Sequence, residues 1–283
     1  MTLSIERTIQ EGAKILQDAA VDETRREAAS LLAHVLGRDR SFLIAHSDES
    51  LPDEQYQIFK NLITRRSRGE PLQYITGHRE FFKLDFEVSP AVLIPRPETE
   101  LIVEAAIEFG KDEPAPVIAD IGTGSGCIAI SILHELGDAV AVAADISAAA
   151  LRIAQRNAQR HGVHDRLTLV RSDCFAAVPN TKAFSLIVSN PPYVSDEEME
   201  HLGREVRFEP RAALAGGKDG LSVVRRLLNE ARPFMRPQGH LVFEIGFGQS
   251  EMVEQLLDRR VWKLLEIRKD LQGIPRTFVL QGR

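Results

Sequence analysis

Apolar runs of strand length that alternate with helical patterns constrain the fold of this 283-residue chain more than any other feature. The strand-like runs are 117–121, 139–145, 167–171 and 184–189. Between the first three lie helical patterns at about 126–136 and 147–161. This alternation is typical of βαβ units, whose strands pair in parallel. We therefore predict an α/β fold built on a mainly parallel, doubly wound sheet.

The chain continues this pattern toward its C-terminus and departs from it near its N-terminus. We predict a helix near 220–235, a strand at 239–245, a helix at 249–258, and strands at 262–268 and 276–281. Near the N-terminus, apolar residues recur at helical spacing, with Gly37 as a C-cap and Gly69-Glu70-Pro71 as a helix break. The predicted domains are a helical bundle at 1–75, a hairpin linker at 76–95 and the sheet-containing domain at 96–283.

One cluster of arginines and one single arginine leave alternatives open. Arg65, Arg66 and Arg68 cluster at the end of a predicted helix, where they either complement the helix dipole or form a patch for a partner. Arg96 is held between two prolines, so it either aims a fixed charge at an anion or serves as a structural link. The sequence does not rank either pair of alternatives.

The charge balance argues against a polyanionic partner. With 35 basic and 41 acidic residues, the net charge is −6, which is unfavourable for binding nucleic acid. Cys127 and Cys174 are the only cysteines, and we expect free thiols in a reducing compartment. The N-terminus lacks a signal-type apolar core, and no apolar run reaches transmembrane length. We expect a cytoplasmic protein with neither a membrane partner nor direct nucleic-acid binding.

A glycine-rich turn, Asp120-Ile121-Gly122-Thr123-Gly124-Ser125-Gly126, closes the first predicted strand and opens a helix. Glycines at these positions let the backbone turn sharply and approach a ligand closely. Their spacing is G-x-G-x-G, whereas a dinucleotide site needs G-x-G-x-x-G to seat a pyrophosphate. The turn also differs from the loop that binds nucleoside triphosphates. A dinucleotide and a nucleoside triphosphate are therefore both disfavoured as ligands.

Two aspartates follow the next two predicted strands. Asp145 ends the second strand, where its carboxylate can accept both hydroxyls of a ribose, and Asp173 follows the third, where it can accept from an adenine amino group. Either one alone is more often a helix cap or a turn residue. Three strand ends that carry the glycine turn and two aspartates favour a nucleoside pocket. The pattern resembles the S-adenosylmethionine site of class I methyltransferases.

The fourth predicted strand ends in Ser189-Asn190-Pro191-Pro192-Tyr193. Pro191 forces Asn190 into an extended conformation, so the turn is stiff. The Asn190 Oδ1 atom and the Pro191 carbonyl can then accept both hydrogens of an incoming NH2 group, while Tyr193 packs against the flat target. An isolated motif of this kind would more often be an ordinary strand exit capped by Asn.

The chemistry suited to such a turn is methyl transfer to an amide or an exocyclic amine. These nitrogens are poor nucleophiles because their lone pairs are delocalised, and two acceptors on the NH2 group oppose that delocalisation and aim the lone pair. The catalysis is then mainly positional. The eight histidines show no spacing typical of a metal site, so we predict no metal.

The whole set of motifs resembles the bacterial release factor glutamine methyltransferase (PrmC/HemK) family. The resemblance covers nearly the whole chain. It is carried by Gln73–Gly77, Phe81-Phe82, Ile94–Glu100, Asp120–Gly126, Asn190–Tyr193, Glu209–Arg211, Gly216-Gly217 and Gly220, which follow the helical N-terminal domain. It implies a class I, Rossmann-like fold with a seven-stranded sheet. It also implies methylation of the side-chain nitrogen of the glutamine in the Gly-Gly-Gln loop of release factors, with S-adenosylmethionine as cofactor.

The resemblance also implies residue roles. The catalytic residues would be Asn190, Pro191 and Tyr193. The cofactor contacts would be Gly122, Thr123, Gly124, Ser125, Gly126, Asp145, Asp173, Cys174 and Asn190. The substrate contacts would be Asn190, Pro191, Pro192 and Tyr193, and the helical domain would help dock the release factor. Relatives often carry a larger aromatic residue at the position of Cys174. In this chain Phe175 is a candidate to take the place of that aromatic residue beside the adenine.

Two rival functions use the same residues. A nucleic-acid methyltransferase acting on N6 of adenine or N2 of guanine would present the same NH2 chemistry to Asn190. The acidic charge balance and the lack of an obvious target-recognition domain argue against it. A binding module without turnover is the other rival, and the intact glycine turn together with Asn190 argues against that.

Overall fold

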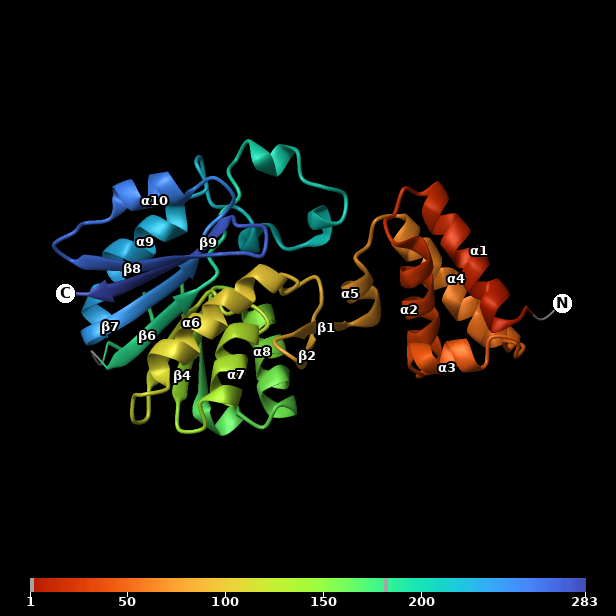
Figure 1. Ribbon diagram of the computed structural model, residues 1–283, viewed down its shortest axis with the longest axis horizontal. Helices are drawn as coiled ribbons and strands as arrows, with labels where there is room; N and C mark the ends of the chain where they lie inside the picture. Colours follow the sequence, from red (N-terminus) through yellow and green to blue (C-terminus); the bar gives the residue numbers. More distant parts are fainter. Residues whose placement is uncertain (1–2, 181–182) are drawn as a thin grey trace. The chain divides into compact units, whose positions relative to one another are not determined.

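The computed structural model describes residues 3–180 and 183–283, which form two compact units (Figure 1). The N-terminal unit comprises Met1–His78 and Gly203–Phe208, and the C-terminal unit comprises Arg79–Leu202 and Glu209–Arg283. The helices in the described part of the chain include none with the length and apolar character needed to cross a membrane.

The N-terminal unit is a bundle of short helices around one apolar core. Its helices are α1 (Ile5–Asp18), α2 (Thr24–Leu36), α3 (Arg40–Ala45), α4 (Asp53–Ser67) and α5 (Leu72–Thr76). Gly37 caps α2 with a φ of 60°, as expected for a glycine C-cap. Helices α3 and α5 were not predicted because six and five residues are too few to show a helical period.

The arginine cluster at the end of α4 is largely engaged within the N-terminal unit. Arg66 is 2% exposed, and its guanidinium donates to the carboxylates of Glu27 and Glu205. Arg65 donates to Glu70 from its Nε atom at 2.8 Å. Two of the three arginines therefore have a structural role as ion-pair partners.

The C-terminal unit is built on the doubly wound sheet that the sequence predicts. Within the described residues, a seven-stranded sheet has the order β5-β4-β3-β6-β7-β9-β8, and β1 pairs with β2 separately. The strands are β1 (His78–Phe81), β2 (Leu84–Glu87), β3 (Val117–Ile121), β4 (Val140–Asp145), β5 (Leu167–Arg171), β6 (Phe184–Ser189), β7 (Met235–Glu244), β8 (Trp262–Lys269) and β9 (Pro275–Gly282). In this sheet β9 pairs antiparallel with both β7 and β8, and the other pairs of described strands are parallel. The predicted fold class is confirmed.

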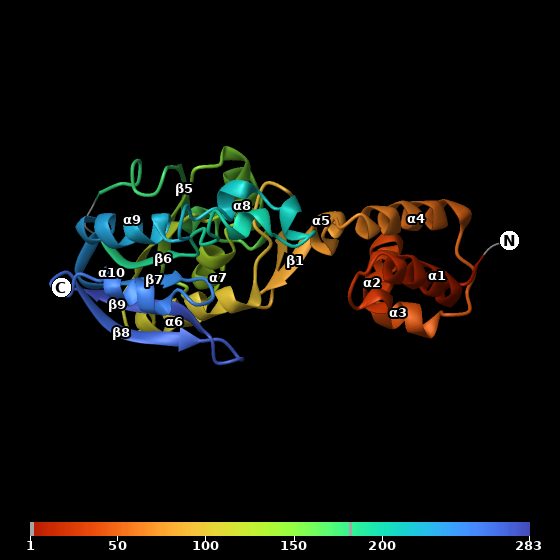
Figure 2. The same ribbon diagram turned by 90° about the horizontal axis from the view of Figure 1, so that it is seen from above.

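Helices cover both faces of this sheet (Figures 1 and 2). They are α6 (Glu100–Gly110), α7 (Cys127–Glu135), α8 (Ala148–Arg160), α9 (Ser222–Glu230) and α10 (Ser250–Leu256). Helices α6, α7 and α8 contribute to one apolar core, while α9 and α10 contribute to the core on the opposite face. Helix α9 is shorter than the predicted 220–235 because Pro233 cannot continue a helix, and a 3-10 turn leads into β7 instead.

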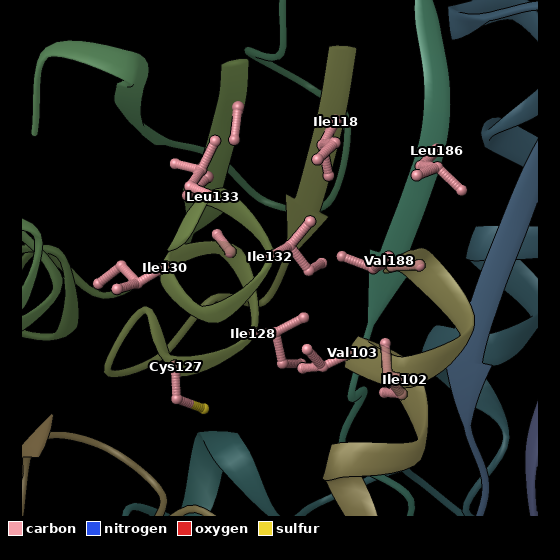
Figure 3. Packing of buried hydrophobic residues seen from close by; sticks show 14 of the residues in the cluster. Ile102, Val103, Ile118, Cys127, Ile128, Ile130, Ile132, Leu133, Leu186 and Val188 are labelled. Atoms are coloured by element: carbon pink, nitrogen blue, oxygen red, sulfur yellow. The ribbon is translucent and has the colours of Figure 1, made fainter. Parts of the chain in front are cut away.

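The core under α6 and α7 anchors the strands that carry the site. Figure 3 shows Ile128 and Ile132 of α7 among side chains from α6, β3 and β6. Ile132 is fully buried, as are Ile118 of β3 and Val188 of β6. These contacts remove apolar surface from water on the same face of the sheet.

The first prediction concerns this core. We expect Ile132→Ala to lower the free energy of unfolding of the C-terminal unit by about 2–5 kcal/mol, because it leaves a cavity in a close-packed core. Urea unfolding followed by the fluorescence of Trp262, the single tryptophan, measures this unit. Leu271→Ala is the matched control, since Leu271 is 107% exposed and its truncation should cost less than about 0.5 kcal/mol. Equal losses in both variants would contradict this assignment of the core.

Candidate active site

A cavity of about 350 Å³ lies at the carboxyl ends of β3, β4, β5 and β6. The segment 91–95 and the segment 210–215 supply further walls. The predicted site residues that line it are Gly122, Thr123, Gly124, Ser125, Asp145, Asp173, Cys174, Asn190, Pro191 and Pro192. Gly126 and Tyr193 are not among its lining residues. Parallel pairing brings all these strand ends to one edge of the sheet, which is where open α/β sheets bind ligands.

The glycine turn adopts backbone conformations that suit glycine. Gly122, Gly124 and Gly126 have φ values of 79°, 56° and 83°. The amide groups of Gly122 and Thr123 donate to the carbonyl of Ala144 at 2.8 and 3.0 Å, which ties the turn to β4. Gly126 caps α7, so its function is to start the helix rather than to line the cavity.

Asp120 stabilises this turn through hydrogen bonds. Its Oδ2 atom accepts from Thr123 Oγ1 at 2.6 Å and from the amide of Ala129 in α7 at 3.3 Å. The carboxyl group is completely buried, and this burial raises its pKa to about 7. Since the hydroxyl of Thr123 is committed to Asp120, Asp120 acts on the geometry of the turn.

Asp145 is fixed at the end of β4 by two backbone donors. Its Oδ2 atom accepts from the amide of Gly124 at 2.9 Å, and its Oδ1 atom accepts from the amide of Ser147 at 2.8 Å. Burial raises its pKa, while the Ser147 and Gly124 donors act in the opposite direction. Each oxygen keeps a lone pair, so the carboxylate can accept from vicinal hydroxyls of a ligand in the cavity.

The segment after β5 places Cys174, not Phe175, at the cavity. Phe175 is 3% exposed and packs against Phe234 with ring centroids 4.9 Å apart. Cys174 lines the cavity, and burial raises the pKa of its thiol to about 11, so it is a neutral apolar surface. The Oδ1 atom of Asp173 accepts from Arg226 at 2.6 Å, which leaves Oδ2 for a ligand.

The turn after β6 is held in place on several sides. Ser189 Oγ donates to the carbonyl of Ile121 at 2.6 Å, and Gln249 Nε2 donates to the carbonyl of Tyr193 at 2.9 Å. Gly220 approaches so closely that an added Cβ atom would lie 2.3 Å from the Tyr193 carbonyl oxygen. This close approach explains why a glycine stands at position 220.

Tyr193 lies differently from the sequence-based expectation. Its hydroxyl interacts with the buried carboxyl of Glu244 at the end of β7. Burial raises the pKa of Tyr193, and Glu244 raises it further. Tyr193 is not among the residues that line the cavity in this structure.

Thr99 and Glu244 are site residues that sequence reasoning missed. Asn190 Nδ2 donates to Thr99 Oγ1 at 2.9 Å, and Thr99 Oγ1 donates to Glu244 Oε2 at 2.6 Å. Glu244 is 1% exposed, and burial raises its pKa to about 7. One signal was present in the sequence, because Glu244 follows the apolar run Leu241-Val242-Phe243 as a carboxylate at a strand end.

Arg96 has a carboxylate partner that decides its role. It donates to Glu209, whose other oxygen accepts from the amide of Ile94 at 3.0 Å. Glu209 is 6% exposed, so the pair holds the 91–95 wall of the cavity against the Glu209-Pro210-Arg211 segment. Of the two alternatives, the structure favours the structural link.

The part of the chain that the structure describes contains no group of three or more His, Cys, Asp or Glu residues that could hold a metal ion.

Comparison with known proteins assigns both units to families. The PrmC N-terminal domain matches residues 7–77, and the Methyltransferase small domain matches residues 104–217. The release factor glutamine methyltransferase of Nitratidesulfovibrio vulgaris is 41% identical over 271 residues, which cover 95% of this chain and 91% of that protein. The enzyme of the same name from Moorella thermoacetica is 43% identical over 283 residues, with 99% of each chain covered.

Solved structures agree with the fold. A methyltransferase from Pyrococcus furiosus superposes with a TM-score of 0.52 at 18% identity, covering 82% of this chain and 98% of that one. At this level of identity the similarity shows the class I methyltransferase fold.

The second prediction tests the packing of Gly220 against Tyr193. We expect Gly220→Ala to lower the free energy of unfolding by more than about 1 kcal/mol, because φ is 75° and the new Cβ atom would overlap the carbonyl oxygen. Gly137→Ala is the matched control, since a Cβ atom there would meet no described atom within 4 Å. Urea unfolding monitored at Trp262 compares the two variants, and a tolerated Gly220→Ala would refute the close approach.

Proposed function

Because the chain belongs to the release factor glutamine methyltransferase family, we propose a specific protein substrate and acceptor atom for it. The protein transfers a methyl group from S-adenosyl-L-methionine to the side-chain amide nitrogen (N5) of the glutamine in the Gly-Gly-Gln loop of peptide chain release factors. The observation that carries this proposal is the placement of Asn190 and Pro191 at the wall of the cavity formed by the strand ends.

The residues at the cavity fit S-adenosylmethionine. The glycine turn allows close approach of the ligand, and Asp145 presents a fixed carboxylate to the ribose hydroxyls. Asp173 Oδ2 can accept from the adenine amino group, and the neutral Cys174 gives the ring an apolar contact. The chemistry that S-adenosylmethionine supplies is a methyl group on a cationic sulfur, which needs no metal.

Asn190 and Pro191 orient the nitrogen that receives the methyl group. The Nδ2 atom of Asn190 is committed to Thr99, so Oδ1 is the atom left to accept from the substrate amide. With the Pro191 carbonyl accepting the second hydrogen, the nitrogen lone pair points out of the plane of the substrate amide. Bound S-adenosylmethionine would supply the methyl group, with the C–S bond breaking as the N–C bond forms, and the nitrogen would lose one proton to solvent. The gain comes from orientation of the reactants.

The N-terminal unit docks the release factor in this proposal. A hollow of about 580 Å³ lies among α1, α2 and α3. Its walls include apolar Ile9, Leu43 and Ile44, acidic Glu6, and basic Arg25, Arg26 and Arg40. Arg25 is paired with Glu6, and Arg26 with Glu23. Ile44 is 77% exposed, which makes it available to a protein partner. The exposed Ile44 and the basic Arg40 suit a segment of the substrate that carries an apolar side chain and a carboxylate. We expect the reaction to take place in the cytoplasm.

The third prediction tests the substrate. We expect the purified protein to transfer labelled methyl groups from S-adenosylmethionine to a purified release factor and not to its Gln→Ala loop variant. Ribosomal RNA in a parallel reaction should stay unlabelled. Label on RNA alone would replace the proposed substrate with an exocyclic amine of a nucleic acid.

The fourth prediction separates binding from turnover. Asn190→Ala should lower kcat by about 100-fold or more, because the amide acceptor is lost, while the Kd for S-adenosylmethionine measured by calorimetry changes little. Asp145→Ala should instead raise that Kd by about 10-fold or more, because it removes charged hydrogen bonds to the ribose. Unaltered turnover in Asn190→Ala, or unaltered affinity in Asp145→Ala, would remove the corresponding role.

A further inference from the structure

At the cavity wall, side chains from three separate segments form one hydrogen-bonded chain. Asn190 and Tyr193 follow β6, Thr99 precedes α6, and Glu244 ends β7. The hydrogen-bonded chain runs from Asn190 Nδ2 to Thr99 Oγ1 at 2.9 Å and from Thr99 Oγ1 to Glu244 Oε2 at 2.6 Å. Thr99 and Glu244 are 2% and 1% exposed, so water does not compete with these bonds.

The carboxylate of Glu244 sets the donor-to-acceptor direction of every bond in this hydrogen-bonded chain. An ionised carboxylate only accepts hydrogen bonds, so Thr99 must donate its single hydroxyl proton to Glu244. The Thr99 oxygen can then only accept a hydrogen bond from Asn190, so Asn190 must donate from its Nδ2 atom. Oδ1 of Asn190, the other end of the planar amide, then points away from Thr99. The carboxylate thus sets the orientation of the Asn190 side chain through one intervening hydroxyl.

We propose that Thr99 and Glu244 are positioning residues that fix the amide of Asn190 with its Oδ1 atom toward the methyl acceptor. The proposal rests on the function proposed above for Asn190 and adds two residues that act through it.

Protonation of Glu244 would allow the donor-to-acceptor direction of these hydrogen bonds to reverse. A carboxylic acid can donate to Thr99, whose hydroxyl can then donate to Oδ1 of a flipped Asn190 amide. The flipped amide presents Nδ2, a donor, to the NH2 group of the substrate. Turnover therefore requires the carboxylate form of Glu244.

The groups around Glu244 set the pH at which this happens. Burial raises the pKa of Glu244 to about 7, the hydrogen bond from Thr99 and the interaction with Tyr193 lower it, the charge of Glu98 raises it and that of Arg276 lowers it. Thr277 is the cross-strand neighbour of Glu244 on β9. Since the carboxylate form is the active one, kcat should fall as the pH decreases through about 7.

Hydroxyl variants test the positioning role. We expect Thr99→Val to lower kcat by about 10- to 100-fold, with the Kd for S-adenosylmethionine within about twofold of wild type, because an isosteric side chain without the hydroxyl leaves Asn190 free to rotate. Thr99→Ser keeps the hydroxyl and should recover most of the lost kcat. Thr277→Val is the matched control, because Thr277 is also buried and its hydroxyl has no hydrogen-bond partner among the described residues.

A pH profile tests the role of the carboxylate. The kcat of the wild type should decline below about pH 7, whereas Glu244→Gln should have a low kcat that is nearly independent of pH from about 6 to 8. A low kcat is expected because an amide at position 244 can donate to Thr99, which reverses the direction of the hydrogen bonds and allows the Asn190 amide to flip.

The outcomes distinguish this inference from the proposed function. A wild-type protein that fails to methylate a release factor overturns both. If the wild type is active, a kcat of Thr99→Val equal to that of Thr277→Val overturns the positioning role alone. A Thr99→Ser variant as slow as Thr99→Val, or a pH profile of Glu244→Gln that parallels the wild type, overturns it as well.

Discussion

The parallel pairing of β3 with β4 and β6 is the constraint on which the rest of the site depends. The register Ala119↔Val142 and Ala119↔Ile187 brings the ends of the three strands to one edge of the sheet. The glycine turn, Asp145 and Asn190 follow these ends, so residues that are distant in sequence line one cavity. Apolar helices on both faces keep the strands in this register, because a slip would move buried side chains toward water.

The site is preorganised because its polar groups form hydrogen bonds and ion pairs within the protein before any ligand binds. Asp120 is engaged with the turn, Asp145 with two amides, and Glu209 with Arg96 and the amide of Ile94. Several of these carboxyls are buried, which makes each hydrogen bond stronger and its loss more costly. A reaction that relies on orientation gains from such preorganisation, since no catalytic group has to be reordered when the substrate arrives.

The sequence predicted the fold class, and it also predicted β3, β5 and β6 with the bounds that the structure has. These strands are apolar runs between clear turn signals, which are local features. The structure corrected or extended the predictions where a distant contact decides the outcome. Glu244 lies 145 residues from Thr99, and Glu209 lies 113 residues from Arg96, so neither pair has a local pattern. The position of Phe175 in the core likewise depends on Phe234, which the sequence alone could not place beside it.

The orientation of the Asn190 amide is the central claim of this account, and neutron diffraction from a perdeuterated crystal at about pH 8 measures it directly. Neutron diffraction shows deuterium atoms, and only Nδ2 of the amide carries them, so Nδ2 and Oδ1 can be told apart. The account predicts deuterium atoms on the side of Asn190 that faces Thr99, a deuterium between Thr99 and Glu244, and a bare Oδ1 toward the cavity. A bare Oδ1 facing Thr99, with the deuterated Nδ2 toward the cavity, would contradict it.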